Sequence, residues 1–173
     1  MSVKQVVIFP DERLREPTRE VTVFDDELST LASDMLDTMY DDEGIGLAGP
    51  QVGDNRRIIV IDIPDDQDRQ HINPMVLINP VVSSHSEEMV ESDEGCLSVP
   101  GYQDKVMRYA TCTVDYQDLK GNPQRIENAT GLLAICLQHE TDHLSGKLFI
   151  DYLSRLKREM LRRKYSKILK NRH

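Results

Sequence analysis

The pattern H-E-x-x-H stands at His139, Glu140 and His143, and it combines residue types and a spacing that suit metal chemistry. Residues four apart on a helix lie on one face, so both imidazoles can bind one metal ion while the glutamate reaches the water that the ion holds. A divalent ion lowers the pKa of such a water to about 7, which provides a nucleophile at neutral pH. The pattern therefore indicates a metal-dependent hydrolase.

The residues around this motif predict a helix over residues 130–143. One stripe along it begins with apolar residues and ends in the two histidines: Leu132, Ile135, Cys136, His139 and His143. Thr130 and Gly131 can begin the helix, and Gly146 can end it. A core helix that binds no metal is the alternative, but the stripe favours a pocket with a metal at its end.

A catalytic metal usually has three protein ligands and a water, so two histidines leave such a site one ligand short. A third histidine six residues after His143, as in metzincins, is excluded because Phe149 stands there. A downstream glutamate, as in gluzincins, would have to be Glu159, which lies in a strongly basic segment. An upstream thiolate remains as a strong alternative.

The chain has three cysteines, an odd number, and its start shows no apolar signal core, so we expect no disulfides and a reducing, cytoplasmic location. Cys112 lies in an alternating, strand-like stretch and is expected in the core. Cys136 lies one turn before His139 and is expected to line the pocket. Cys96 follows a glycine in a turn-rich passage that can aim a thiolate, which makes it the favoured third ligand.

The glycine-rich passage from Gly44 to Gln51 matches the dinucleotide fingerprint G-x-G-x-x-G, but its context excludes that function. The fingerprint needs a strand before it and a helix after it, whereas here an amphipathic helix precedes it and Pro50 and Gly53 follow. We expect a loop that leads to Gln51, whose carboxamide can donate a hydrogen bond to a developing oxyanion. A simple helix stop and turn is the alternative.

Three ordered segments resemble the motifs of peptide deformylases, which are G-x-G-L-A-A-x-Q, E-G-C-L-S and Q-H-E-x-D-H. The corresponding segments here are residues 44–51, 94–98 and 138–143. The similarity extends over essentially the whole chain. Members of this family remove the formyl group from the N-terminal methionine of newly made proteins, so the resemblance implies that N-formylmethionyl nascent peptides are the substrates.

The resemblance implies a role for each matching residue. The implied metal ligands are Cys96, His139 and His143, with Glu140 as general acid and base. Gln51 and the backbone N–H of Leu97 would polarise the formyl oxygen. The implied pocket for the methionine side chain and the peptide backbone comprises Ile45, Gly46, Glu94, Leu132, Ile135 and Cys136. The implied native ion is Fe²⁺, with Zn²⁺, Ni²⁺ or Co²⁺ able to occupy the same site.

Some positions depart from the family pattern. Gly49 stands where the family usually has a second alanine, and we expect it to loosen the loop that holds Gln51. Ser92 replaces an aliphatic pocket residue, and the match around Tyr102 is too poor to assign a substrate role there. Asp142 lies off the ligand stripe, where it either pairs with Arg108 to support the ligands or is a solvated helix charge.

The 173 residues suit one domain, and the predicted class is α+β, with small antiparallel sheets around a central metal-binding helix. An N-terminal helix is expected over residues 26–42, capped by Asp25 or Asp26, and a basic C-terminal helix over 152–170. The expected strands are 57–63, 75–78, 105–115 and 124–127, with a turn over 118–123 and a loop over 62–68.

The charge is unevenly distributed. The chain carries −9, but residues 151–173 carry +7, so residues 1–150 carry −16. The C-terminal helix has a predicted apolar stripe of Leu153, Leu156, Met160, Tyr165, Ile168 and Leu169, which favours packing on its own domain. Contact with an anionic partner, the RNA of the ribosome, is the alternative. No apolar run approaches the roughly 20 residues that cross a membrane, so no membrane contact is expected.

Overall fold

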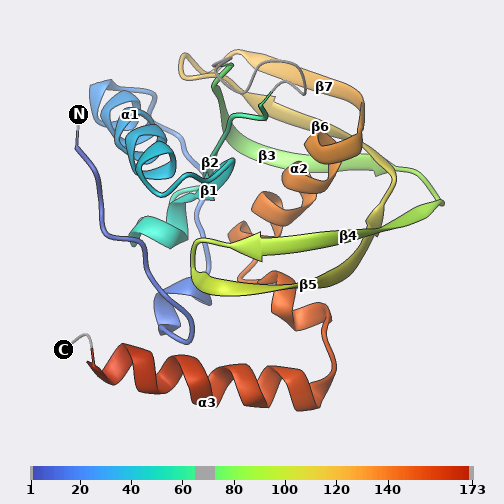
Figure 1. Ribbon diagram of the computed structural model, residues 1–173. Helices are drawn as coiled ribbons and strands as arrows, with labels where there is room; N and C mark the ends of the chain where they lie inside the picture. The colour runs from blue at the N-terminus through green and yellow to red at the C-terminus, as the bar shows by residue number, and fades with distance from the viewer. Residues whose placement is uncertain (1, 65–72, 172–173) are drawn as a thin grey trace.

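The computed structural model describes residues 2–64 and 73–171, and its helices and strands form the mixed arrangement shown in Figure 1. A five-stranded antiparallel sheet has the order β1-β2-β3-β6-β7 and consists of β1 (Gly46–Ala48), β2 (Ile58–Ile61), β3 (Met75–His85), β6 (Thr111–Gln117) and β7 (Pro123–Thr130). A separate hairpin pairs β4 (Met89–Cys96) with β5 (Val99–Tyr109). The helices are α1 (Asp26–Asp41), α2 (Gly131–Leu144) and α3 (Arg155–Asn171). The predicted α+β class is confirmed.

Helix α1 covers one face of the five-stranded sheet. Asp25 caps it, because the Asp25 side chain accepts a hydrogen bond of 3.1 Å from the N–H of Leu28. Its buried apolar side chains pack against Ile58 and Val60 of β2, and they are Leu28, Leu31, Ala32, Met35 and Met39. Burial of each large side chain of this kind stabilises the fold by about 1.5–3 kcal/mol.

Helix α2 covers the opposite face. Successive side chains of a strand point to opposite sides, so Ile59 and Ile61 of β2 face α2 and pack with its Ala134 and Leu137. The β4–β5 hairpin contacts α2 from the other side, which places α2 between the sheet and the hairpin (Figure 1). The predicted central position of this helix is confirmed.

The end of α2 is fixed immediately after its second histidine. Gly146 adopts a left-handed φ of +74°, its N–H donates to the carbonyl of His143, and the N–H of Lys147 donates to the carbonyl of Asp142. This pair of bonds is the Schellman arrangement, which ends a helix at a glycine. The predicted helix end at Gly146 is confirmed.

Helix α3 packs beneath the hairpin through few residues. Leu161 and Tyr165 are buried with Phe9, Val99 and Phe149, the last of which begins the short 3₁₀ helix η3 (Phe149–Tyr152). Two further 3₁₀ helices are η1 (Glu12–Leu14) and η2 (Gly49–Val52). The predicted apolar stripe of α3 is wrong in part, because Leu156 and Met160 are exposed while Leu161, outside the stripe, is buried.

The strand predictions need three corrections. The stretch 105–115 is not one strand, since the chain leaves the hairpin after Tyr109 and enters the larger sheet at Thr111. The predicted strand 75–78 continues to His85, and β1 and β4 were not predicted. Strand β4 has few apolar residues because much of it is exposed, so the alternation that marks a strand is weak there. Part of the predicted loop 62–68 lies outside the described residues.

Candidate metal centre

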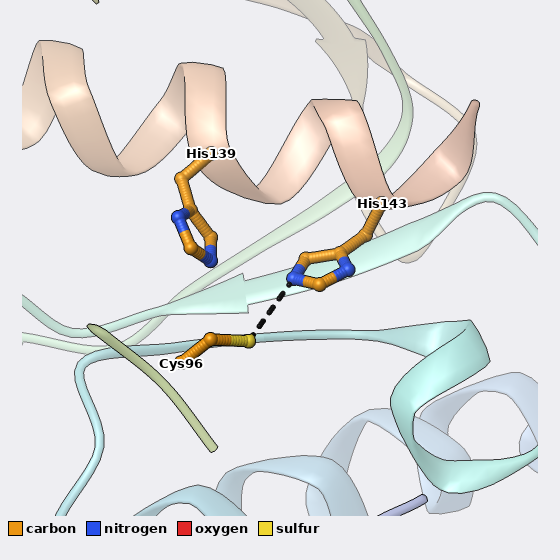
Figure 2. A group of neighbouring side chains, drawn as sticks. All are labelled: Cys96, His139 and His143. Atoms are coloured by element: carbon orange, nitrogen blue, oxygen red, sulfur yellow. Dashed lines mark hydrogen bonds between the residues drawn. The ribbon is translucent and has the colours of Figure 1, made fainter. Parts of the chain in front are cut away.

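Cys96, His139 and His143 lie together at the contact between the hairpin and α2 (Figure 2). One ligand atom from each residue lies within 4.8 Å of the other two, and the Cys96 Sγ is 3.5 Å from His143 Nε2. Positions 47 residues apart in the chain are thereby brought to one point. The two histidines come from successive turns of α2, as the H-E-x-x-H spacing requires.

The hairpin directs Cys96 toward the helix. The pairing register of β4 with β5 shifts between Gly95 and Cys96, and Cys96 then pairs with Val99 across a two-residue turn. Irregular positions of this kind bend a strand and change the direction of a side chain. The structure therefore brings the sulfur to the histidines at the place where the sequence has its turn-rich passage.

A buried ion pair holds His139. Its Nδ1 lies 2.8 Å from Oε1 of Glu94, and Arg108 binds both oxygens of Glu94 at 2.7 and 2.8 Å. Burial raises the pKa of Glu94, but the hydrogen bonds from Arg108 and His139 outweigh it and lower the pKa to about 2. Since the ionised carboxylate only accepts hydrogen bonds, Nδ1 carries the hydrogen and Nε2 is left to bind a metal.

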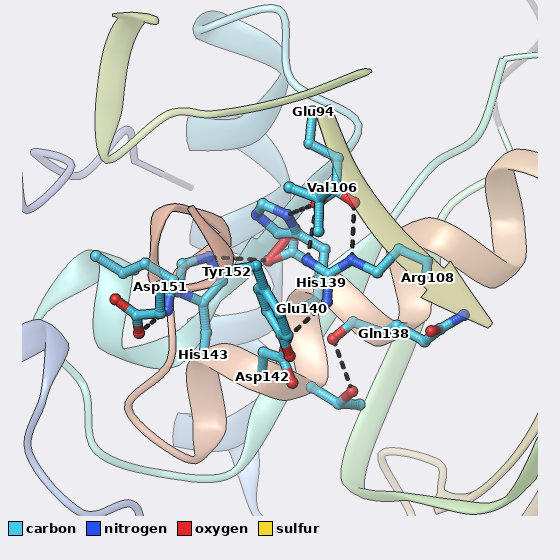
Figure 3. A network of polar contacts seen from close by, with 12 residues as sticks. Glu94, Val106, Arg108, Gln138, His139, Glu140, Asp142, His143, Asp151 and Tyr152 are labelled. Carbon is cyan, nitrogen blue, oxygen red and sulfur yellow. Dashed lines mark hydrogen bonds and ion pairs between the residues drawn. The ribbon is translucent and has the colours of Figure 1, made fainter. Parts of the chain in front are cut away.

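Arg108 extends this network to Asp142 of α2 and to Tyr152 (Figure 3). Its Nη1 donates to Oδ2 of Asp142 at 2.7 Å, and the hydroxyl of Tyr152 donates to the same oxygen at 2.7 Å. The guanidinium carbon lies 4.8 Å from the centre of the Tyr152 ring. Of the two interpretations of Asp142, the pair with Arg108 is the one that forms.

Two buried polar atoms of α2 have no hydrogen-bond partner among the described residues. One is Oε1 of Glu140, which lies 3.9 Å from His143 Nε2, and the other is Nδ1 of His143, the ring nitrogen that does not face Cys96. Burial raises the pKa of Glu140 to about 7. Burial, together with the positive charge of His139 and Arg108, lowers the pKa of His143 well below its ordinary value, so His143 is a neutral imidazole. An unsatisfied buried carboxylate oxygen in a native fold calls for a partner, and one thiol with two imidazoles is a donor set that fits a divalent cation.

Gln51 is fixed beside this group. Its Oε1 accepts a hydrogen bond of 2.9 Å from the N–H of Ala48, so its Nε2 points toward Ser98 Oγ at 3.0 Å and Cys96 Sγ at 3.3 Å. A Cβ at Gly49 would lie 2.7 Å from the carbonyl oxygen of Arg56. Glycine at position 49 allows the backbone to pack this closely, while the expectation that Gly49 loosens the loop stays a prediction.

A cavity of about 1000 Å³ opens at the centre. Every residue of the pocket that the resemblance implied lies in its wall, and these are Ile45, Gly46, Glu94, Leu132, Ile135 and Cys136. Gln51, Cys96, Leu97, His139 and Glu140 also line it. Gly46 has no room for a side chain, because a Cβ there would lie 2.5 Å from Oε2 of Glu140.

The sequence did not indicate every part of this wall. The N-terminal segment 3–6 and the β5 residues Gly101, Tyr102 and Gln103 also line the cavity. The N-terminal segment has no motif that could have identified it. Its position depends on pairing with Gln51, whose carbonyl accepts a 2.7 Å hydrogen bond from the N–H of Val7.

At one end of the cavity, a buried carboxylate lies next to a cluster of one thiol and two imidazoles. This arrangement is characteristic of metal-dependent hydrolases. Comparison with known proteins narrows that class. The chain belongs to the polypeptide deformylase family, which it matches over residues 3–159. The resemblance noted in the sequence is thus confirmed, and with it the activity, which is hydrolysis of the formyl-methionine amide of nascent peptides by a metalloenzyme.

Individual relatives agree along nearly the whole chain. The peptide deformylase of Rhizobium meliloti (strain 1021) is 48% identical over 172 residues, which cover 99% of this chain and 97% of that protein. The crystal structure of a peptide deformylase from Legionella pneumophila has a TM-score of 0.87 at 47% identity, covering 99% and 98% of the two chains. The Ehrlichia chaffeensis enzyme in complex with actinonin has a TM-score of 0.90 at 43% identity, covering 96% and 98%.

Proposed function

We propose that Cys96, His139 and His143 hold a divalent metal ion and that Glu140 moves the protons of formyl-amide hydrolysis. The observation that carries this assignment is the meeting of three ligand atoms within 4.8 Å. Oε1 of Glu140 lies 3.9 Å from one of them, His143 Nε2, and has no hydrogen-bond partner among the described residues. Other parts of the chain fix two of these ligands, since Glu94 orients His139 and the hairpin turn directs Cys96. A prearranged site of this kind binds an ion with little reorganisation.

The ion bound there would supply Lewis acidity, which polarises an oxygen and lowers the pKa of water to about 7. We propose Fe²⁺ as the native ion, with Zn²⁺, Ni²⁺ or Co²⁺ able to occupy the site, because one thiolate and two imidazoles suit all of them. Ferrous iron next to a thiolate is sensitive to oxygen, so the iron-loaded enzyme should lose activity in air.

Glu140 is suited to exchange protons in both directions. Burial raises its pKa to about 7, so neither protonation state is strongly favoured at neutral pH. In the proposed mechanism Glu140 takes a proton from the attacking water and then gives it to the leaving amine. That second transfer is required because an amine leaves poorly unless it is protonated.

Gln51 and Leu97 are assigned to the negative charge that develops on the formyl oxygen. The hydrogen bond from Ala48 fixes the Gln51 amide so that its donor faces the centre, and Leu97 follows the ligand Cys96 in the cavity wall. Donors that are fixed in advance stabilise an oxyanion without a cost of reorientation.

The remaining wall residues are assigned to the substrate, with one exception. Ile45, Leu132, Ile135 and Cys136 give the cavity apolar surface for the methionine side chain, and Gly46 provides backbone close to Glu140. Glu94 lies in the same wall, but both of its oxygens are engaged by Arg108 and His139. We therefore assign Glu94 to the orientation of His139 and not to the binding of the peptide.

The direct test is release of formate from a formyl-Met peptide, measured before and after treatment with a chelator and again after the metal is restored. We expect the chelator to abolish formate release and the metal to recover it. A Cys96→Ala variant should not recover with metal. Full activity after removal of all metal would contradict the assignment, as would cleavage of internal peptide bonds in an unblocked peptide.

We also propose that the enzyme acts in the cytoplasm and that α3 contacts the RNA of the ribosome. The basic side chains of Arg158, Arg162 and Arg163 are exposed on this helix, and the phosphate backbone of RNA attracts such a surface. Among the described residues, no helix is long and apolar enough to cross a membrane. Reversal of these three charges should weaken co-sedimentation with ribosomes, most strongly at low salt. Unchanged binding at both low and physiological salt would contradict this contact.

A further inference from the structure

The short helix η3 folds back over the helix that carries the histidines, and its last residue, Tyr152, reaches the charged network described above (Figure 3). The Tyr152 hydroxyl donates to Oδ2 of Asp142 at 2.7 Å. The Tyr152 ring lies under the guanidinium of Arg108, 4.8 Å from the guanidinium carbon to the ring centre. One side chain therefore contacts both members of the Arg108–Asp142 pair.

A continuous chain of hydrogen bonds connects Tyr152 to His139, a proposed metal ligand. Arg108 donates to Asp142 from Nη1, and its two other donors bind both oxygens of Glu94. Glu94 in turn accepts from Nδ1 of His139. The planar guanidinium is a rigid fork, so any change in its tilt at the Asp142 end moves the carboxylate that orients the imidazole.

Tyr152 also separates the network from solvent. The Arg108 side chain is only 3% exposed although the neighbouring Asp142 side chain is 21% exposed. A cation held over an aromatic ring is stabilised by the ring, and more so when water is excluded. Tyr152 itself is 48% exposed, so it forms the outer layer of the network and not part of the core.

The same element approaches His139 a second time. Phe149, the first residue of η3, is buried and stacks on the His139 ring with centroids 6.0 Å apart and an angle of 25° between the planes. The imidazole is thus held through its nitrogen by the network and through its face by Phe149. Helix η3 contributes to both restraints, directly through Phe149 and indirectly through the contacts of Tyr152 with Asp142 and Arg108.

We propose that Tyr152 is a positioning residue for the metal centre, which holds the His139 imidazole in its ligating orientation through Asp142, Arg108 and Glu94. The inference rests on the proposed metal site. It assigns a function in metal retention to a residue that lies outside the cavity wall and outside all three sequence motifs.

The test compares Tyr152→Phe, which loses only the hydroxyl, with Tyr152→Leu, which also loses the ring. Tyr40→Phe is the matched control, because Tyr40 is similarly exposed and its hydroxyl donates to Asp62 at 2.5 Å. Among the described residues, the Asp62 carboxylate bonds Tyr40 and Asn73 and none of the three proposed ligands. The rate of Co²⁺ release from each loaded protein to excess chelator is measured. Loss of residues that orient metal ligands typically weakens binding about 10–100-fold, so we expect about 10-fold faster release for Tyr152→Leu, a smaller increase for Tyr152→Phe and none for the control.

Two further measurements separate positioning from general stability. The visible spectrum of the Co²⁺ protein reports ligand geometry and should change in Tyr152→Leu, while thermal unfolding of the metal-free variants should stay close to that of the wild type. In turnover, kcat should fall and KM should stay unchanged, because Tyr152 does not line the cavity.

The results that would overturn the inference are distinct from those that would overturn the metal site. Wild-type release rates and an unchanged spectrum in both Tyr152 variants would refute the positioning function. An equal acceleration in Tyr40→Phe would refute it too, since the loss of any phenol–carboxylate bond would then suffice. A wild-type protein that takes up no Co²⁺ would refute the proposed site itself.

Discussion

The metal centre and helix α3 differ in the exposure of their charged side chains and in whether these have fixed partners. In the centre, Glu94 and Arg108 are at most 5% exposed and each is bound by fixed partners, because a buried charge without a partner is strongly destabilising. In α3 most basic side chains are exposed, and only Leu161 and Tyr165 are buried. The comparison teaches that the structure of the metal centre depends on the identity of each of its residues, whereas the packing of α3 depends mainly on two buried residues.

The largest effect is expected where a buried charge has a chemical role. Glu140→Ala should retain the metal but lose turnover by roughly 10²–10⁴-fold, because the leaving amine is no longer protonated. The measurement is kcat for a formyl-Met peptide, with metal content determined on the same sample as the control. Near-normal turnover would remove Glu140 from the mechanism.

A comparable effect on stability is expected at Arg108. Arg108→Ala leaves the buried Glu94 without the cation that binds both of its oxygens, which should lower the free energy of unfolding by about 3–5 kcal/mol. The matched control is Arg162→Ala on the exposed face of α3, where a surface substitution should change stability by less than about 0.5 kcal/mol. Denaturant unfolding measures both. If the two variants lost similar stability, the contrast between the centre and α3 would be wrong.

The same contrast explains what could be predicted from the sequence. His139, Glu140 and His143 were accessible because helix periodicity places them together without any knowledge of the rest of the fold. Cys96 needed both its turn-rich setting and the family resemblance, since nothing local fixes a partner 47 positions away. Tyr152 was missed because its contacts with Arg108 and Asp142 exist only after η3 has folded back over α2.

The elements that were missed or misplaced depend on tertiary contacts. Strand β1 has only three residues and is defined by its pairing with β2, so no periodic pattern can indicate it. Strand β4 is largely polar and exposed. In α3, the stripe containing Leu156 appeared apolar, but the face that is buried is set by where Phe9 and Val99 lie.

The anchors of α3 should matter for stability and not for chemistry. Leu161→Ala removes a side chain that is 1% exposed, which should cost about 2–4 kcal/mol of unfolding free energy while kcat stays close to normal. Leu156→Ala is the control, because Leu156 is 81% exposed and should be nearly neutral. A large drop in kcat for folded Leu161→Ala would show that α3 also shapes the cavity through β5.

The smallest effect is expected at the polar contact between α3 and the hairpin. Among the residues that the structure describes, one ion pair links α3 to the rest of the chain, and it joins Lys157 Nζ to Asp104 at 3.0 Å. The hydroxyl of Tyr102 donates to the same carboxylate. Hydrogen bonds from Tyr102 and then Lys157 lower the pKa of Asp104 to about 2. Because the ion pair lies at the surface, with the Lys157 side chain 50% exposed, screening keeps its contribution small.

The direction of its pH dependence follows from that pKa. The unfolded value is about 3.9, so the stabilising contribution is fully present above it and is lost as the pH falls toward 2. Asp104→Asn should lower the midpoint of thermal unfolding slightly at pH 6, and the difference from the wild type should shrink as the pH falls below about 4. High salt should shrink it as well, since exposed pairs are screened. A difference that persists at low pH would mean that the contact holds α3 by packing and not by charge. This end of α3 would then depend on fixed, close contacts, as the metal centre does.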